Sequence, residues 1–321
     1  MQARESAHMA AAAVIALCII YNHSFVRNVE VLDRLYASSF DRILHIVPNH
    51  KSTRKDILTA YRSSHVFQGY LADNRSTIEA LGADYIAFAA DDCLLNSKCI
   101  VDKVTAGIDR TQASAFFPGF AGPLAAPSAW KWAHTLPAVS RFFGSPKLAN
   151  PQIEGWLDYL PDLERARSAL ARYNAAELRL GRPTPDELAV YSSSDRTNIT
   201  ALFGEADAIE LPFPFVRGLA DFGVLHRDCI AKFLDYCGVF SSLNLWVEVA
   251  IPTAGALLEK KLVFASDLGL KVDWDWSDPR RSPRWPQPTD LMDVYRMVEE
   301  MPGDLLFRHP VKLSGVTTTR S

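Results

Sequence analysis

The chain has 321 residues, of which 48% are apolar and 22% are charged, and its formal net charge is −3. This composition is typical of a globular protein with a large core, and the small net charge excludes a global field that recruits nucleic acid. The five cysteines contain no CxxC pair, so we expect free thiols in a reducing cytoplasm rather than disulfides or a zinc cluster.

The first apolar segment, residues 9–20, is either the core of a signal peptide or a buried strand. It continues into polar residues without a cleavage pattern of small side chains, and it is too short to cross a bilayer. We therefore expect a flexible leader over residues 1–12, followed by a strand.

Strand-like and helix-like segments alternate over residues 13–115. The expected strands are 13–21, 41–49, 65–70 and 84–90, and the expected helices are 25–38, 53–64 and 74–83. Such alternation predicts an α/β fold with a mostly parallel, Rossmann-like sheet flanked by helices.

Residues 116–208 interrupt this pattern with a segment rich in Pro, Gly and aromatic residues, which predicts a helical and loop insertion. Helical patterns within it cover residues 160–181 and 184–195. The α/β pattern returns over residues 209–272, and residues 273–321 form a C-terminal loop, helix and basic tail. The expected elements here are a strand before residue 227, helices at 228–240 with Asp228 as N-cap, 244–260 and 292–300, and a strand at 261–270; Pro252 is a potential break in the second helix.

Two adjacent acids, Asp91 and Asp92, follow the strand at 84–90 directly. Ligands of open parallel sheets bind outside the carboxyl ends of the strands. Two carboxylates there suit Mg²⁺ or Mn²⁺, which prefer oxygen ligands and bridge them to phosphate groups. The simpler alternative is that Asp91 caps the next helix and Asp92 faces solvent.

Four segments resemble, in order, the GT-A glycosyltransferases, which transfer a sugar from a nucleotide diphosphate. They are "IALCIIYNHSFVRNVEVLDRL", "ADNRSTIEALGADYIAFAADDCLL", "FVRGLADFGVLHRDCIAKFLDYCGVFSSLNLWVEVAI" and "LFRHPVKLSG". The second contains a match to the family's DxD motif, in which Asp92 takes the place of the final, metal-binding aspartate. Ala90 stands where the first aspartate would fall, and this departure bears on whether the metal is required.

The resemblance implies a GT-A-like fold, with residues 13–115 as the nucleotide-binding half and 209–272 as the acceptor-side half. It implies transfer from a nucleotide-sugar donor to a glycan or lipid-linked acceptor, with inversion, in the synthesis of a bacterial-type surface polysaccharide. It also implies a Mg²⁺ or Mn²⁺ ion held by Asp92 and by His309, and a location in the cytoplasm or at the inner face of the membrane.

Glu248 is the candidate general base, because it is an acid in the apolar segment "LNLWVEVAIPTA", where an unpaired charge is costly. The alternative is a structural ion pair with Arg217 or Arg227. Asp221, between the glycines of "GLADFG", is a second candidate as base or as ligand of the acceptor hydroxyl, or else a turn residue.

Five residues are candidates for nucleotide binding besides Asp91. Tyr21, Asn22 and His23 end the first strand, where an aromatic ring can stack on a base and an amide can contact its edge, unless they only form a turn. Asn74 and Arg75 are candidates for ribose or phosphate, with a helix cap and a solvated cation as alternatives.

The tail segment "RHPVK" offers His309 as a metal ligand and Lys312 as a diphosphate contact, with a solvated basic tail as the alternative. The loop at residues 278–286 is either solvated or a peripheral contact with an anionic membrane or glycan. Two other functions fit the same pattern less well. A nucleotidyltransferase usually has a Gly-rich phosphate loop, which "YNHSFVRN" lacks, and a non-catalytic glycan-binding protein needs neither metal nor buried acid.

Overall fold

The computed structural model describes residues 13–123, 158–189, 193–211, 213–274 and 285–317. The leader expected at residues 1–12 and most of the 278–286 loop lie outside these ranges. Within them, no helix is both long enough and apolar enough to cross a membrane.

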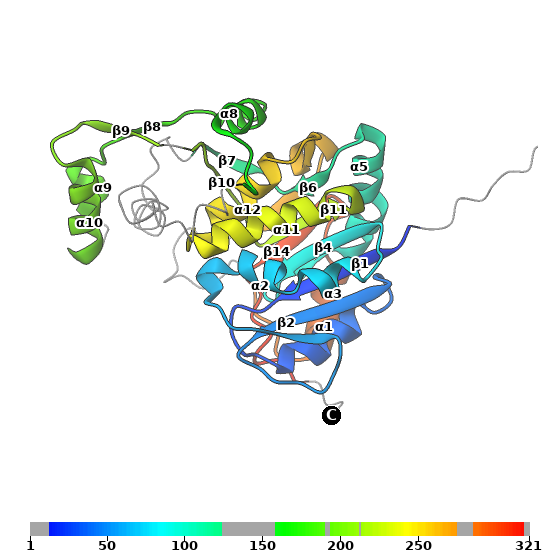
Figure 1. The fold of residues 1–321 in the computed structure, drawn as a ribbon. Helices are drawn as coiled ribbons and strands as arrows, with labels where there is room; N and C mark the ends of the chain where they lie inside the picture. The colour runs from blue at the N-terminus through cyan, green and yellow to red at the C-terminus, as the bar shows by residue number, and fades with distance from the viewer. Residues whose placement is uncertain (1–12, 124–157, 190–192, 212, 275–284, 318–321) are drawn as a thin grey trace, which may run out of the picture.

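A seven-stranded sheet forms the centre of the molecule, in the order β12-β6-β11-β4-β1-β2-β3 (Figure 1). Its strands are β1 (Ile15–Ile20), β2 (Arg42–Pro48), β3 (Ile57–Ala60), β4 (Tyr85–Ala90), β6 (Ala115–Phe117), β11 (Phe222–His226) and β12 (Leu262–Phe264). Only β11 runs antiparallel to its neighbours. The predicted α/β fold with a mostly parallel sheet is therefore confirmed.

Each face of this sheet is buried against its own apolar layer. The alternation of side chains along β1 sends Ala16, Cys18 and Ile20 into one core and Ile15, Leu17 and Ile19 into the other. The first core includes residues of α2 (Gln68–Asp73), α3 (Arg75–Glu79), α11 (Arg227–Ser242) and α12 (Val247–Ala256), and the second includes residues of α1 (Arg27–Tyr36), α5 (Thr105–Thr111) and α13 (Leu291–Glu299). Burial on both faces explains why these strands are continuously apolar.

Three small sheets complete the described structure. They are β13-β14-β5 (Lys271–Trp274, Leu305–His309, Leu94–Leu95), β10-β7 (Val216–Gly218, Phe120–Pro123) and β8-β9 (Arg179–Gly181, Ala208–Glu210). The remaining helices are α4 (Ser97–Cys99), α8 (Leu163–Ala171), α9 (Pro185–Ala189) and α10 (Ser193–Phe203), together with 3-10 or π turns at Ser64–Val66, Ile100–Val104 and Ala265–Leu268. Helices α9 and α10 project away from the sheet (Figure 1). The pairing of β14 with β5 brings the C-terminal tail beside the segment that follows Asp91 and Asp92.

The sequence predicts a helix at 53–64 and a strand at 65–70, and both predictions are wrong. Residues 57–60 form β3, which pairs in parallel with β2 at the edge of the sheet. The hydroxyl of Ser63 then accepts a hydrogen bond from the backbone of His65 and opens a 3-10 turn that leads into α2. Pairing with a neighbouring strand overrides the local pattern in so short a segment.

Three other boundaries also differ from the prediction. Helix α8 ends at Ala171 rather than near Gly181, and the later residues form β8. The N-cap of α11 is His226, whose ring Nδ1 accepts from the backbone of Asp228, so the predicted Asp228 cap is wrong. The strand predicted at 261–270 is shorter, because β12 ends at Phe264 and a 3-10 turn follows at Ala265–Leu268. Pro252 lies inside α12 without ending it. All five cysteines are buried and free, as predicted.

Candidate functional site

The strand order reverses between β1 and β4, because the chain leaves β1 toward β2 on one side and β4 lies on the other. Ligands of open α/β sheets bind at such a switch point, outside the carboxyl ends of the strands. Asp91 occupies this position: its backbone N–H donates to the Ile20 carbonyl at 2.9 Å, and its Oδ1 accepts from the Asn22 backbone at 3.3 Å.

The side chain of Asp91 is buried, with the residue only 4% exposed. Its Oδ2 accepts a hydrogen bond of 2.7 Å from Asn28 Nδ2 in the first turn of α1. Burial and the neighbouring charge of Asp92 raise the pKa of the Asp91 carboxyl to about 7, although the hydrogen bonds oppose this effect. A carboxyl held this way is costly to ionise unless a cation lies nearby.

Asp92 contacts the C-terminal tail through both its side chain and its backbone. Its Oδ1 lies 3.1 Å from His309 Nε2, across 217 positions of sequence, and its carbonyl accepts from the Val311 backbone at 2.8 Å. The Asp92 side chain remains about a quarter exposed. One edge of the carboxylate is therefore anchored while the rest faces outward.

His309 is 1% exposed and lies among acids. Burial alone would lower its pKa, but the charges of Asp221, Asp92 and Glu248 outweigh burial and raise the pKa to about 9. The Oδ1 of Asp221 lies 4.0 Å from His309 Nε2, and the Asp221 carbonyl accepts from Ala90 at the end of β4. The structure thus brings Asp91, Asp92, Asp221 and His309 together.

Glu248 belongs to the same group by its electrostatic contact with His309. It lies half-buried in the first turn of α12, where the helix dipole favours a negative charge. Its field also acts on Arg217 of β10, which is 3% exposed and whose pKa is lowered by burial and partly restored by Glu248. Arg227 instead pairs with Asp84 at 2.9 Å, so of the two ion-pair alternatives only Arg217 is near.

The nucleotide-binding candidates at the end of β1 differ in how far their side chains are buried. Tyr21 is fully buried and its hydroxyl lies 2.8 Å from His45 Nδ1, so its ring offers no face for a base. Asn22 is half-buried beside Asp91, and His23 is exposed. Phe25, two residues further and 43% exposed, forms an edge contact with His23 at 5.3 Å between ring centroids.

In the described structure, the Asn74 and Arg75 side chains bind residues of helices α2, α3 and α11, and not the acids near Asp91. Asn74 Nδ2 donates to the Tyr70 carbonyl at 2.9 Å, and Arg75 pairs with Glu79 at 2.8 Å and with Asp235 of α11. Asn74 thus binds a carbonyl of α2 without capping α3 through its side chain, and Arg75 is ion-paired rather than solvated. Lys312 is exposed, and its backbone N–H donates to Gln287 Oε1 at 2.6 Å.

Asn28 and Phe25 belong to this region but were not predicted from the sequence. Asn28 is buried, its Nδ2 binds Asp91, and its Oδ1 has no hydrogen-bond partner in the described structure. The sequence does carry a signal for it, because Asn28 shares the apolar face of α1 with Leu32 and Leu35. Phe25 carried no such signal, since exposed aromatic residues in turns are common.

The donor set fits a hard divalent cation. Adjacent ligand atoms of an octahedral ion with bonds of about 2.1 Å lie about 3 Å apart. Asp92 Oδ1 and His309 Nε2 lie 3.1 Å apart as hydrogen-bond partners, so a cation would replace the proton between them. Carboxylates are ligands that Mg²⁺ and Mn²⁺ prefer, a neutral imidazole is a common metal ligand, and a cation there would offset the repulsion between Asp91 and Asp92. Asp92 and His309 are the residues that would hold it.

A second carboxylate cluster, Asp33, His45 and Asp56, lies between α1, β2 and the start of β3 and has the spacing of a metal site. Here Arg54 already supplies the positive charge, at 2.7 Å from Asp33 and 3.1 Å from Asp56. Hydrogen bonds from His45 and Arg54 outweigh burial and lower the pKa of Asp33. The cluster is therefore compensated from within the chain.

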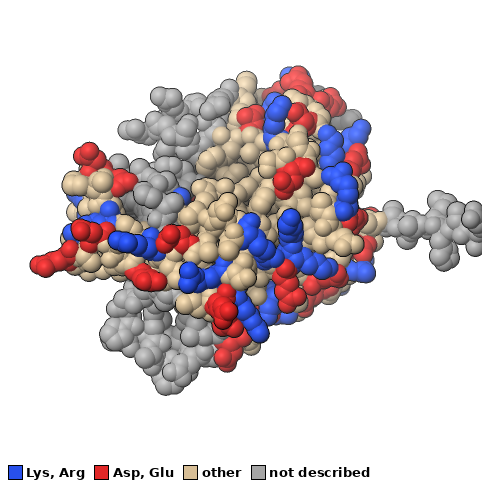
Figure 2. Space-filling view, turned by 90° about the horizontal axis from the view of Figure 1, so that it is seen from above, with Lys and Arg blue, Asp and Glu red and all other residues tan. Residues whose placement is uncertain are grey.

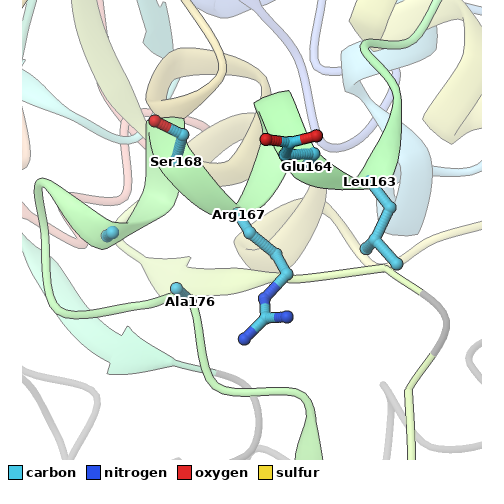
Figure 3. Close-up of a pocket in the computed structure, with 6 residues that line it drawn as sticks. Leu163, Glu164, Arg167, Ser168 and Ala176 are labelled. Carbon is cyan, nitrogen blue, oxygen red and sulfur yellow. The ribbon is translucent and has the colours of Figure 1, made fainter.

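A shallow pocket of about 520 Å³ lies against α8, lined by Leu163, Glu164, Arg167, Ser168, Ala171 and Ala176 (Figure 3). Arg167 and Glu164 extend from the helix there, but no predicted site residue lines it. On the face seen in Figure 2, basic and acidic side chains are interspersed. We therefore place the candidate site at the switch point and not at the pocket beside α8.

Comparison with known proteins assigns no family. No protein-family model matches the sequence, and no curated protein matches it significantly.

Proposed function

We propose that this protein is a metal-assisted glycosyltransferase of the GT-A kind. The observation that carries the proposal is the buried Asp91 beside Asp92 at the switch point, with His309, Asp221 and Glu248 gathered around them. Several carboxylates close together at the carboxyl ends of β1 and β4 suit a cation, and such a cation can bind the diphosphate of a nucleotide-sugar donor. The resemblance in sequence, described above, supports the same class.

The proposed roles follow from burial and contact. Asp92 and His309 would hold Mg²⁺ or Mn²⁺, and the ion would neutralise charge on the leaving diphosphate. Asp91 is buried and holds Asn28 and the Asn22 backbone, so its proposed role at the nucleoside is to position the turn that carries Asn22. Asn22 and the exposed pair His23 and Phe25 contact the base, a role that the buried Tyr21 is not placed to fill.

Glu248 takes the proton of the acceptor hydroxyl as that oxygen attacks the anomeric carbon. The bond to the acceptor forms, the bond to the diphosphate breaks, and the configuration inverts. The charge of Glu248 acts on both Arg217 and His309, so these three side chains lie in one electrostatic neighbourhood. Asp221 orients the acceptor hydroxyl, and Lys312 contacts the diphosphate.

The acceptor is proposed to be a glycan or lipid-linked glycan of a bacterial-type surface polysaccharide, in the cytoplasm or at the inner face of the membrane. This part of the proposal depends on the resemblance alone.

The test is a thermal shift measurement with UDP-, GDP-, CMP- and dTDP-sugars, with and without Mn²⁺. We expect one nucleotide to raise the melting temperature in a Mn²⁺-dependent way. Donor hydrolysis then separates the roles, because Asp92→Ala should lose donor binding whereas Glu248→Gln should retain it. Absence of stabilisation by every nucleotide would favour a binding protein, and release of pyrophosphate from a nucleoside triphosphate would favour a nucleotidyltransferase.

A further inference from the structure

The tail segment that carries His309 is held from two sides. On one side, β14 pairs with β5, and the Val311 backbone donates to the Asp92 carbonyl at 2.8 Å. On the other side, residues 285–291 run beside residues 310–317. This second contact begins with a hydrogen bond from Trp285 Nε1 to the Pro310 carbonyl and ends with one from the Leu291 backbone to Thr317.

Trp285 is the buried member of this second side. It is 9% exposed, and its ring belongs to the same apolar cluster as Val311, Phe307 and Cys93. Its Nε1–H donates to the Pro310 carbonyl at 3.1 Å, and Pro310 directly follows His309. The indole therefore binds the carbonyl of the Pro310–Val311 peptide unit, whose N–H donates to the Asp92 carbonyl, while the His309 imidazole contacts the Asp92 side chain.

We propose that Trp285 is a positioning residue that fixes His309 against Asp92 and so completes the site for a divalent cation. This inference rests on the proposed function for the cation itself. It assigns an influence on metal affinity to Trp285, which lies in the loop at residues 278–286 that the sequence predicts to be either solvated or a peripheral contact with an anionic membrane or glycan.

The physical reason is the cost of an unpaired buried carbonyl. If the indole N–H is removed, the Pro310 carbonyl loses its donor in an apolar surrounding and the tail shifts to recover one. A ligand whose orientation depends on that peptide unit then departs from the geometry that the ion requires. Loss of such outer partners of a metal ligand typically costs about 10- to 100-fold in affinity.

The experiment is a calorimetric titration of the full chain with Mn²⁺ alone, for wild type, Trp285→Phe, His309→Ala and Asp92→Ala. Trp285→Phe retains the aromatic ring and removes only the donor. We expect it to weaken Mn²⁺ binding about tenfold, approaching the effect of His309→Ala, with little change in melting temperature. Trp246→Phe is the matched control, since that half-buried tryptophan contacts His65 and should leave Mn²⁺ binding unchanged.

Two failures are distinguishable. If wild type binds Mn²⁺ and His309→Ala weakens binding while Trp285→Phe does not, the positioning role is wrong and the proposed function stands. If wild type binds no Mn²⁺, the proposed metal site itself is wrong.

Should Trp285→Phe fail to fold, hydrogen exchange of wild type decides the question. We expect Mn²⁺ to slow amide exchange in residues 285–291 as well as in 309–312. Slowing confined to 309–312 would overturn the inference.

Discussion

Two carboxylate clusters in this protein have similar composition but opposite electrostatics. Around Asp33 and Asp56, Arg54 lies within 2.7 Å and 3.1 Å of the two acids, and the pKa values of both are lowered. Around Asp91 and Asp92, the His309 imidazole lies 3.1 Å from Asp92, and the pKa of Asp91 is raised to about 7. Helix α1 contributes to both clusters, through Asn28 beside Asp91 and through Asp33 beside His45.

The difference separates a structural network from a functional one. In the first cluster the chain supplies its own countercharge, and the acids stabilise the fold in their ionised form. In the second cluster, the chain only partly offsets the repulsion between Asp91 and Asp92. The remaining repulsion lowers the stability of the fold and favours binding of a cation. Substitutions at Glu248 and in the two clusters test this contrast.

The largest expected effect is on transfer. Glu248→Gln should lower the rate of sugar transfer about 10²- to 10⁴-fold, because the amide cannot accept the proton of the acceptor hydroxyl. Binding of the nucleotide-sugar, measured by calorimetry, should be retained. Asp56→Asn, in the compensated cluster, is the control and should transfer normally. A Glu248→Gln enzyme with normal turnover would contradict the role of the base.

The next effect is a loss of stability in the compensated cluster. Asp33→Ala removes the partners of buried His45 and of Arg54, so the free energy of unfolding should fall by about 1 to 3 kcal/mol near neutral pH. The folded state lowers the pKa of Asp33, so its contribution is present above the unfolded value near 4 and is lost as pH falls through the folded value. Urea unfolding at several pH values measures this, and a difference that grows on acidification would contradict it.

The smallest effect has the opposite sign. Asp91→Asn should raise the free energy of unfolding by about 1 to 2 kcal/mol near pH 8 without metal, because it removes a buried charge next to Asp92. The folded state raises the pKa of Asp91 from 3.8 to about 7, so wild type loses stability as pH rises through this interval. The difference should vanish near pH 4. Destabilisation by Asp91→Asn at both pH values would show that Asp91 is a structural anion like Asp33.

Much of the fold could be predicted because its segments are strongly periodic. The strand that became β1 is continuously apolar, and α1 has a clear apolar face, so both were recognisable from the sequence. The region of β3 and α2 was not, since β3 has four residues and is defined by its pairing with β2 rather than by its own pattern. The prediction of the α11 N-cap was wrong for a related reason. His226 and Asp228 are both possible caps, and the helix begins directly after His226, which has the extended backbone of an N-cap.

The candidate site was predictable only in part. Asp91 and Asp92 could be located because they follow a buried strand at the end where ligands bind. Tyr21 illustrates the limit, since a strand-terminal tyrosine points either to ligand or to core, and His45 draws it inward. The contact of His309 with Asp92 joins segments 217 positions apart, and no local pattern encodes it.

The central claim is that the uncompensated cluster, and not the compensated one, binds a divalent cation. The most direct measurement is a calorimetric Mn²⁺ titration of wild type, Asp92→Ala and Asp56→Ala at one pH. We predict a single Mn²⁺ site in wild type that weakens at least about tenfold in Asp92→Ala and is unchanged in Asp56→Ala. Unchanged binding in Asp92→Ala, or its loss in Asp56→Ala, would contradict the account.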